Sequence, residues 1–424
     1  MVVQPWVAEL TVEGGRAVLH NQRRSFYAAK GISFLMRPVT HRIPFLAVLV
    51  IGACRGPSDR ASGLRISTDS SDRYPVVRSL GVAPTRSTQP LVVIGGTGGP
   101  AEFGSIRSVL LAGDGSVYVA DPSYRVVSIF DSAGRLVRQL GREGAGPGEY
   151  RDPYSLAWLG QGIALLDPGN SRIGLYDSAG HWTKSWIVQR ISGSQFIRLY
   201  RTPPTFWSYG LRPAGAQQEG IFIQYTRAGP TDTLTFIRPS TGLAKGRVCH
   251  RPDKGITFFS APFGPVLLEI PTPGARRAPA LSTSYRIAFV NAQGDTIRAI
   301  ERQVPPAPIS DEEWEEANAD WIKFRKDWPT ASCDHGEFER PEFKPPLAFL
   351  FYDDIGQLWV ELTTPEGPRY DVFDSEGRLL VSVTGLPSTE GVDPSVAGHR
   401  IAFVGRDSAD APVVRIFRVV PEHE

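Results

Sequence analysis

Short apolar runs separated by turns dominate the chain from about residue 76 onward. Ser116–Asp121 and Gly162–Asp167 are short apolar or β-branched segments that accompany a glycine-containing turn. Arg135–Leu140 instead alternates polar and apolar side chains, as a strand with one face in water does. Runs this short, bounded by Gly and Asp, predict an all-β domain.

A sequence repeat organises these runs. Asp121 and Asp167 lie 46 positions apart, and so do Phe130 and Tyr176. Each of these two aromatic residues is followed by Asp-Ser-Ala-Gly, which predicts a hairpin turn because Asp can bond its own backbone and Gly accepts a positive φ. A unit of about 46 residues that holds about four strands predicts sheets arranged radially.

Weaker copies of the unit continue toward the C-terminus. They are Phe236–Gly242, Phe289–Ile300, Gly356–Val360 with Tyr370–Val383, and the final pair His399–Val404 and Val413–Val419. With the first two units this makes six, so the predicted fold is an all-β, six-bladed β-propeller. The last unit has too few strands, and Pro90–Ile94 is predicted to complete it, because a closed ring leaves few exposed strand edges.

The loops around the first two units resemble those of NHL-type six-bladed propellers. The resemblance rests on Gly141–Tyr150, Asp167–Ile173 and the similar Gly95–Phe103. The first unit departs from the pattern, with Tyr124 where the second has Asn170 and Val126 where the second has Arg172. The resemblance therefore implies the propeller fold, without a binding rim repeated in every blade.

Residues 303–345 break the strand pattern between the fourth and fifth units. Ser310-x-x-Glu313 is a capping box and Pro329 follows the last basic turn, so the pattern predicts one helix. Its apolar side chains form one stripe at helical spacing: Trp314, Ala317, Trp321, Phe324 and Trp328. We expect the stripe either to pack on the propeller as a lid or to border a groove in which the three tryptophans contact a partner.

The N-terminal region has the pattern of an export signal. Basic side chains precede an apolar run, Ile43–Ala53, that is too short to span a bilayer. Residues 51–54, Ile-Gly-Ala-Cys, resemble the lipobox of bacterial lipoproteins, which implies cleavage before Cys54 and acylation of its thiol. The alternative is a core strand with a buried cysteine.

Domain boundaries follow from this signal. Such signals begin close to the initiating methionine, so the start is predicted at Met36, with residues 1–35 a non-native upstream extension and 36–53 the signal peptide. Residues 54–75 are rich in Ser, Asp, Arg and Gly and are predicted to form a flexible tether, followed by the propeller at 76–424. The expected location is the cell envelope, with the lipid anchor at the periplasmic face or the cell surface.

Charge and cysteine content narrow the choice of partners. Removal of residues 1–53 leaves 40 basic and 42 acidic residues among 371, with no basic run, so nucleic-acid binding is not expected. Cys249 and Cys333 remain besides the lipidated cysteine. They are either one disulfide, formed in an oxidising compartment, or two buried thiols.

Candidate chemistry is sparse in this sequence. Asp121 and Asp167 recur at one repeat position, which favours binding of loop amides over paired catalytic carboxylates. Residues 334–337, Asp-His-Gly-Glu, hold possible metal ligands, and some NHL-type lyases use zinc, but no His-x-His or Cys-x-x-Cys spacing supports a site.

No cofactor and no catalytic residue is predicted. The expected function is a scaffold that binds a protein or small ligand; the alternative is a metal-dependent lyase or hydrolase acting in the central channel.

Overall fold

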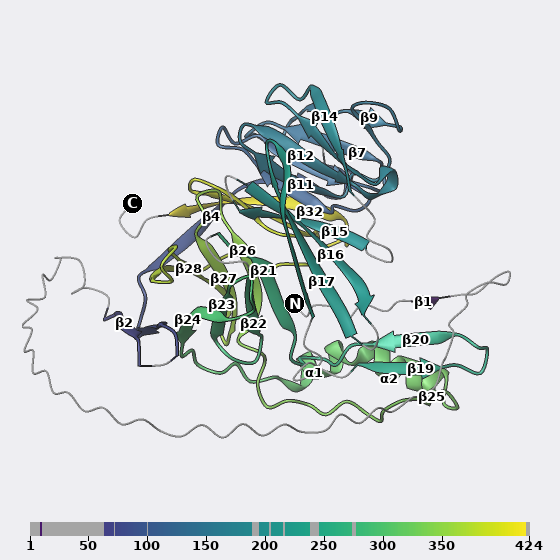
Figure 1. Cartoon of the computed structure of the whole chain (residues 1–424). Helices are drawn as coiled ribbons and strands as arrows, with labels where there is room; N and C mark the ends of the chain where they lie inside the picture. Colours follow the sequence, from purple (N-terminus) through teal and green to yellow (C-terminus); the bar gives the residue numbers. More distant parts are fainter. Residues whose placement is uncertain are drawn as a thin grey trace, which may run out of the picture.

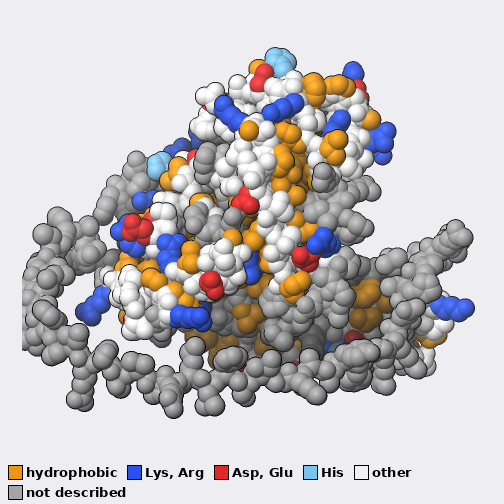
Figure 2. All heavy atoms as spheres, in the orientation of Figure 1, with side chains coloured by type: hydrophobic (Ala, Val, Ile, Leu, Met, Phe, Trp, Pro, Cys, Tyr) orange, Lys and Arg blue, Asp and Glu red, His pale blue; other side chains and the backbone are white. Residues whose placement is uncertain are grey.

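The computed structural model describes residues 9–10 and 63–420, except 72, 100, 189–194, 203–204, 215–216, 238–245 and 274–276. Most of these residues form strands in small separate sheets (Figure 1), which confirms the all-β prediction. Basic and acidic side chains are mixed on the face drawn in Figure 2. Within the described ranges no helix is long and apolar enough to cross a bilayer.

The two strongest sequence repeats form blades 1 and 2, each an antiparallel sheet of four strands. Blade 1 is β5 (Ser108–Leu111), β6 (Val117–Asp121), β7 (Val126–Phe130) and β8 (Leu136–Gln139); blade 2 is β11 (Ser155–Leu159), β12 (Gly162–Asp167), β13 (Arg172–Tyr176) and β14 (Trp182–Ile187). The predicted turn joins the third and fourth strands, where the Asp131 carboxylate accepts two backbone amides and Gly134 has a φ of 80°. Asp177 holds the equivalent turn of blade 2.

Blades 3, 4 and 5 repeat the four-strand plan. Blade 3 consists of β15 (Gln195–Thr202), β16 (Thr205–Ala214), β17 (Gln217–Thr226) and β18 (Gly229–Ile237). Blade 4 consists of β21 (Leu267–Pro271), β22 (Arg277–Leu281), β23 (Arg286–Val290) and β24 (Thr296–Arg302). Blade 5 consists of β26 (Leu347–Tyr352), β27 (Leu358–Thr364), β28 (Gly367–Phe373) and β29 (Leu379–Val383). The weaker copy at Phe236–Gly242 equates Phe236 with Phe130, which ends the third strand of blade 1. This equivalence is wrong, because Phe236 lies in the fourth strand of blade 3, β18. Blade 3 has strands of up to ten residues, so the sequence spacing of the other blades does not transfer to it.

An early strand and the last strand of the described chain meet in blade 6. This blade consists of β30 (Ser395–Ala397), β31 (Arg400–Arg406), β32 (Pro412–Val420) and β4 (Thr85–Gly95). β4 pairs antiparallel with β32, with Ile94 opposite Val414 and Val92 opposite Ile416. The predicted closure of the last blade by Pro90–Ile94 is confirmed, and the ring has six blades.

The segment before β4 forms an added hairpin. β2 (Arg65–Asp69) pairs with β3 (Val76–Leu80), and β3 runs parallel to β24, which widens the blade 4 sheet to six strands. The tether predicted for residues 54–75 therefore needs correction from Arg65 onward. Four of the five β2 residues are exposed, so this strand lacks an apolar pattern and is held by backbone pairing, which a hydropathy pattern does not report.

Apolar side chains are buried mainly between neighbouring blades. Clusters of buried side chains join blades 6 and 1, 1 and 2, 2 and 3, 4 and 5, and 5 and 6. All five residues of β6 are buried because both faces of its sheet are covered, whereas all four of the outer strand β8 are exposed. Burial on two faces explains why the inner strands are continuous apolar runs.

Two connections between blades form a small subdomain, named the cap below. β19 (Arg247–His250) and β20 (Ile256–Phe259) precede blade 4, while α1 (Asp311–Ala317), α2 (Ala319–Asp327) and β25 (Ser332–Cys333) follow it. β19 pairs with β25 on one side and with β20 on the other, and β20 also pairs with β1 (Glu9–Leu10), which lies in the predicted upstream extension. The prediction of one uninterrupted helix is wrong at Asn318, where φ is −101° and ψ is 1°. The Asn318 amide still bonds to the Trp314 carbonyl, so the two helices keep a common apolar face.

A buried carboxylate anchors the connection between blades 5 and 6. Glu361 on β27 is 2% exposed and accepts the Thr389 amide with both oxygens, at 3.1 and 3.2 Å. Burial raises the pKa of Glu361, and the hydrogen bonds from Thr389 oppose that shift. The carboxyl group therefore binds its proton more tightly in the folded chain than in the unfolded one.

Replacement of Ile94 tests the ring closure. Ile94 is fully buried between blades 6 and 1, so Ile94→Ala should lower the free energy of unfolding by about 2–5 kcal/mol. Val93→Ala on the same strand, where the residue is 56% exposed, is the matched control and should change it by about 0.5 kcal/mol or less. Urea denaturation measures both changes. Equal losses would mean that β4 does not bury its inward face against blade 1.

Glu361→Gln should change how stability depends on pH. Because the folded pKa of Glu361 is raised, its stabilising contribution is complete below the unfolded value of about 4.3 and is lost as pH rises through the folded pKa. Gln offers a neutral acceptor to the Thr389 amide at every pH. The free energy of unfolding of the variant, relative to wild type, should therefore increase between about pH 4 and pH 8 in urea titrations. The exposed Glu376→Gln serves as the control, and a relative decrease would contradict the prediction.

Candidate functional site

The first strands of the blades surround a central channel that widens at one end. A cavity of about 330 Å³, named the wide pocket, lies where the first strands turn into the second. It is lined by the β5–β6, β11–β12, β15–β16 and β26–β27 turns and by β30, so five blades contribute. None of its lining residues comes from blade 4, and β15 of blade 3 contacts β26 of blade 5 directly.

Serine side chains join the first strands of adjacent blades along this channel. The Ser395 hydroxyl of blade 6 accepts the Leu111 amide of blade 1 at 2.8 Å. Ser108 of blade 1 and Ser155 of blade 2 each accept a backbone amide of the following blade, both at 3.0 Å. These buried hydroxyls fix the spacing of blades 6, 1, 2 and 3 and so shape the channel wall.

Arg201 separates the wide pocket from the other end of the channel. It lines the wide pocket and also a cavity of only about 20 Å³ at the opposite end. Its guanidinium group donates to the Pro394 carbonyl of the strand entry to blade 6 and, at 3.5 Å, to the Val109 carbonyl of blade 1. A side chain from blade 3 thus reaches across the channel to two other blades, and Arg201 forms the inner end, or floor, of the wide pocket.

The acidic side chains of the wide pocket hold the turns that carry them. Asp353 is 4% exposed and accepts three hydrogen bonds, two from turn amides and one from the Trp359 indole at 3.1 Å. Burial raises the pKa of Asp353, and these hydrogen bonds oppose the shift. Asp354 is exposed at the rim and accepts the Gly398 amide of blade 6 at 3.2 Å. Of the two carboxylates, Asp354 is the one that solvent reaches.

Trp158 supplies a flat apolar wall. Its indole N–H donates to the Leu111 carbonyl at 3.2 Å, and its ring meets the Tyr118 ring edge-on with centroids 5.5 Å apart. These contacts fix the ring between blades 1 and 2. Gly113 lines the same pocket, and no atom lies within 4 Å of the position that a Cβ would take there. A side chain added at Gly113 would therefore enter open space at the pocket.

The repeated aspartates bind loop amides, as predicted. Asp121 is fully buried, and its carboxylate accepts amides both from the loop that enters blade 1, at Gly104 and Ser105, and from its own turn. Asp167 accepts the Arg151 and Asp152 amides of the loop that enters blade 2. Each aspartate joins a blade to the connection from the previous blade, which is a structural role.

The NHL-like residues of blade 2 hold the glycine-rich loop between blades 1 and 2. This loop contains β9 (Arg142–Glu143) and β10 (Glu149–Tyr150), which pair in parallel, and it packs near the η1 turn (Pro168–Asn170). The Arg172 guanidinium donates to three loop carbonyls, and the Asn170 side chain donates to the Gly144 carbonyl at 2.8 Å. Blade 1 has Tyr124 and Val126 at the positions of Asn170 and Arg172, so it lacks these hydrogen bonds from side chains to the loop.

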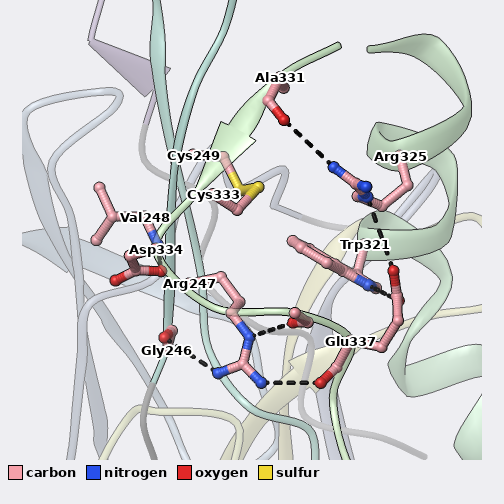
Figure 3. The surroundings of a disulfide bond; sticks show 11 residues. Gly246, Arg247, Val248, Cys249, Trp321, Arg325, Ala331, Cys333, Asp334 and Glu337 are labelled. Carbon is pink, nitrogen blue, oxygen red and sulfur yellow. Dashed lines mark hydrogen bonds and ion pairs between the residues drawn. A yellow bond between two sulfur atoms is a disulfide. The ribbon is translucent and has the colours of Figure 1, made fainter. Parts of the chain in front are cut away.

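The predicted partner-binding tryptophans lie in the core of the cap. Trp321 is 2% exposed and donates its indole N–H to Glu337 (Figure 3), while Trp314 and Trp328 are half-buried against the same cluster. The stripe packs on β20 and the adjacent loops, with the Phe259 and Trp321 ring centroids 5.2 Å apart. The expectation that it packs on the propeller itself is corrected: it covers the cap sheet. Helix-period patterns identify a buried face but not the surface that buries it.

A disulfide joins the two connections that build the cap. Cys249 on β19 and Cys333 on β25 are opposite each other in the strand register and are bonded, with an S–S distance of 2.03 Å (Figure 3). Next to it, the Asp334 carboxylate accepts the Val248 amide at 3.0 Å. The Arg247 guanidinium donates to two carbonyls of the following loop, at 2.6 and 3.0 Å.

Two of the candidate metal ligands at residues 334–337, Asp334 and Glu337, make structural contacts. Asp334 fixes the β19–β25 pairing, and Glu337 accepts the Trp321 indole while facing Arg325. Among the described residues no group of three or more His, Cys, Asp and Glu side chains is placed to hold a metal ion. Cys54, the predicted lipidation site, lies outside the described residues.

Sequence reasoning missed the channel serines, the Arg201 floor and the Trp158 wall. Ser108 and Ser155 lie 47 positions apart, close to the repeat period, so aligning the first two repeats with each other would have shown their equivalence. Arg201 has no repeat equivalent that would single it out. Its place at the channel floor follows from the arrangement of blades 1, 3 and 6 in space.

One family model matches part of the chain. The model DUF5128, described as a 6-bladed beta-propeller, matches residues 97–189. This range contains blades 1 and 2, where the sequence repeat is strongest. Among curated proteins none matches this sequence.

Several solved structures are similar to this chain at low identity. A putative exported protein from Bacteroides fragilis is 10% identical, with 79% of this chain and 95% of that chain covered and a TM-score of 0.38. A DUF4221 member from Bacteroides vulgatus is 11% identical, covering 80% and 98% with a TM-score of 0.41. The calcium-binding protein regucalcin from Agrobacterium tumefaciens is 11% identical, covering 80% and 97% with a TM-score of 0.37. The sheet order and the matching family model together establish a six-bladed β-propeller.

Proposed function

We propose that this chain is an extracytoplasmic β-propeller of the NHL type, held to a bacterial membrane by a lipid on Cys54, that binds a small ligand in the wide pocket. The observation that carries the binding function is the pocket itself, a cavity of about 330 Å³ built from five blades. Its volume lies at the lower end of the range for small-molecule sites. Two features of its walls argue for binding rather than reaction.

The ionisable groups of the wide pocket are few and already serve the fold. They are Arg201, Tyr352, Asp353 and Asp354. The Asp353 oxygens accept three hydrogen bonds and Arg201 spans two blades, so removing either would disturb the channel wall. The Ser395 hydroxyl, also in the wall, accepts the Leu111 amide. The remaining walls offer an indole face and aliphatic side chains, which recognise shape and apolar surface.

The disulfide and the export signal support a location outside the cytoplasm. Disulfides persist in oxidising compartments and are rare in the cytosol. The Cys249–Cys333 bond joins connections that lie on either side of blade 4, and the apolar run at Ile43–Ala53 ends directly before Cys54. The predicted lipid anchor and the disulfide of the cap therefore both support an oxidising compartment outside the cytoplasm.

Filling the pocket should weaken binding without unfolding the chain. Gly113→Trp places an indole in open space at the pocket wall, whereas Gly336→Trp, also at an open position, lies in the cap. With anilinonaphthalene sulfonate as the probe, wild type and Gly336→Trp should bind with one saturable site and Gly113→Trp at least about tenfold more weakly. Fluorescence titration measures this. Equal binding by all three proteins would exclude the wide pocket as the site.

Metabolic labelling tests the lipid anchor. When the full chain is expressed in a bacterium with labelled palmitate, wild type should incorporate the label and Cys54→Ala should not, because acylation requires that thiol. The double variant Cys249→Ala, Cys333→Ala is the control and should still be labelled. Mass spectrometry should place the mature N-terminus at Cys54. Label in Cys54→Ala, or none in wild type, would refute the anchor.

A further inference from the structure

The chain enters the fold at a fixed point beside blade 4. Leu64 packs against the apolar cluster shared by blades 4 and 5. The Gly63 carbonyl lies so close to Gly81 that a Cβ on Gly81 would approach it to 2.5 Å, and Gly81 has a φ of 90°. The β2–β3 hairpin that begins here is therefore part of the folded body, and Gly63 marks where any tether must attach.

The distance from this point to the proposed anchor is short. Nine residues lead from Cys54 to Gly63, and at about 3.5 Å per residue they span at most about 30 Å when fully extended. A compact chain of about 360 residues has a radius of gyration of about 20 Å, hence a diameter of about 50 Å. The tether is shorter than the molecule is wide, so the side of the propeller that carries β2 cannot point directly away from the lipid surface.

Exposed aliphatic side chains gather at this entry point. Ile66, Leu80 and Val82 are 40%, 46% and 72% exposed, and each lies within three residues of Gly63 or Gly81. Arg65 is exposed and is the register partner of Leu80. We name Arg65, Leu80 and Val82 the entry patch; Ile66, the register partner of the buried Ser79, lies on the opposite face of the hairpin. Arginine with aliphatic neighbours suits the boundary between acyl chains and anionic headgroups.

We infer that the entry patch rests on the membrane, against a lipid surface that contains anionic headgroups. This inference rests on the proposed anchor at Cys54. By itself a patch of three side chains would bind lipid weakly. A short tether, however, holds the patch at an effective concentration in the millimolar range, so a weak contact is enough to orient the molecule.

The orientation has a consequence for the wide pocket. In Figure 1, β2 lies at the opposite side of the molecule from β9 and β14 of the blade 1 and blade 2 region. With the entry patch on the membrane, blades 1 and 2 point away from it. The Trp158 wall and the Gly113 turn of the pocket belong to these two blades, so this part of the pocket wall lies farther from the bilayer than the blade 4 sheet that carries β2.

Chemical tethering tests the orientation without relying on natural acylation. In the chain from Cys54 onward, which contains all six blades and the cap, Cys54 is the single free thiol because Cys249 and Cys333 are bonded to each other. It is coupled to a maleimide lipid in vesicles containing about 30% phosphatidylglycerol or phosphatidylcholine alone. Hydrogen exchange of the backbone amides is then compared with that of the untethered chain.

We expect exchange over residues 63–82 to slow at least about fivefold on the anionic vesicles and less on phosphatidylcholine, with blades 1 and 2 unchanged. Leu80→Asp with Val82→Asp should remove this protection. Val137→Asp, at a position on β8 that is 59% exposed, is the matched control and should retain it. Urea denaturation of each variant confirms that the fold is intact.

Equal exchange in tethered and untethered chains, or protection in blades 1 and 2 instead, would overturn the orientation. Because the tether is chemical, either result bears on the entry patch alone. Failure of the natural anchor shows separately, in the palmitate labelling of Cys54→Ala and wild type.

Discussion

The pairing of β4 with β32 is the interaction on which the rest of the structure depends. It joins Ser87–Gly95 to Val413–Val420, more than 300 positions apart, in one antiparallel ladder. Without β4, blade 6 would have three strands and an unpaired edge, and the apolar side chains between blades 6 and 1 would lose one wall. β4 also pairs with β29 of blade 5 at Ser382 and Val383. One strand therefore ties three blades together.

Closure of the ring holds the blades around a channel of defined shape. Each blade buries apolar side chains against its neighbours, and the serines on β5, β11 and β30 set the spacing of four blades through buried hydrogen bonds. The wide pocket is the space that remains where the first strands diverge. Its floor, Arg201, reaches from blade 3 to blades 1 and 6, so the pocket exists only in the assembled ring.

The cap has a hydrophobic core of its own. Its core contains Trp321, Phe324 and Phe259, side chains separate from the clusters between blades. Two connections that leave and enter blade 4 build it, and the disulfide holds them together at the β19–β25 pairing. The tryptophan stripe is thereby used for internal packing, whereas the aliphatic side chains Leu80 and Val82 at the entry of the chain stay exposed.

The sequence by itself determined the blade count, the hairpin turns and the closing strand. These features depend on local chemistry: the Asp-x-x-Gly turns, the period near 46 residues, and apolar runs long enough for one strand each. It also identified Asp121 and Asp167 as structural, since a repeated position implies a repeated contact. It misplaced Phe236 because blade 3 has longer strands, and it missed β2 because an exposed strand held by backbone pairing has no hydropathy pattern. Only the tertiary structure decided that Cys249 faces Cys333, that the tryptophan stripe covers the cap sheet, and that Arg201 reaches across the channel. Each of these is a contact between segments distant in sequence, and their approach follows from how blades and connections pack, which no local pattern of residues encodes.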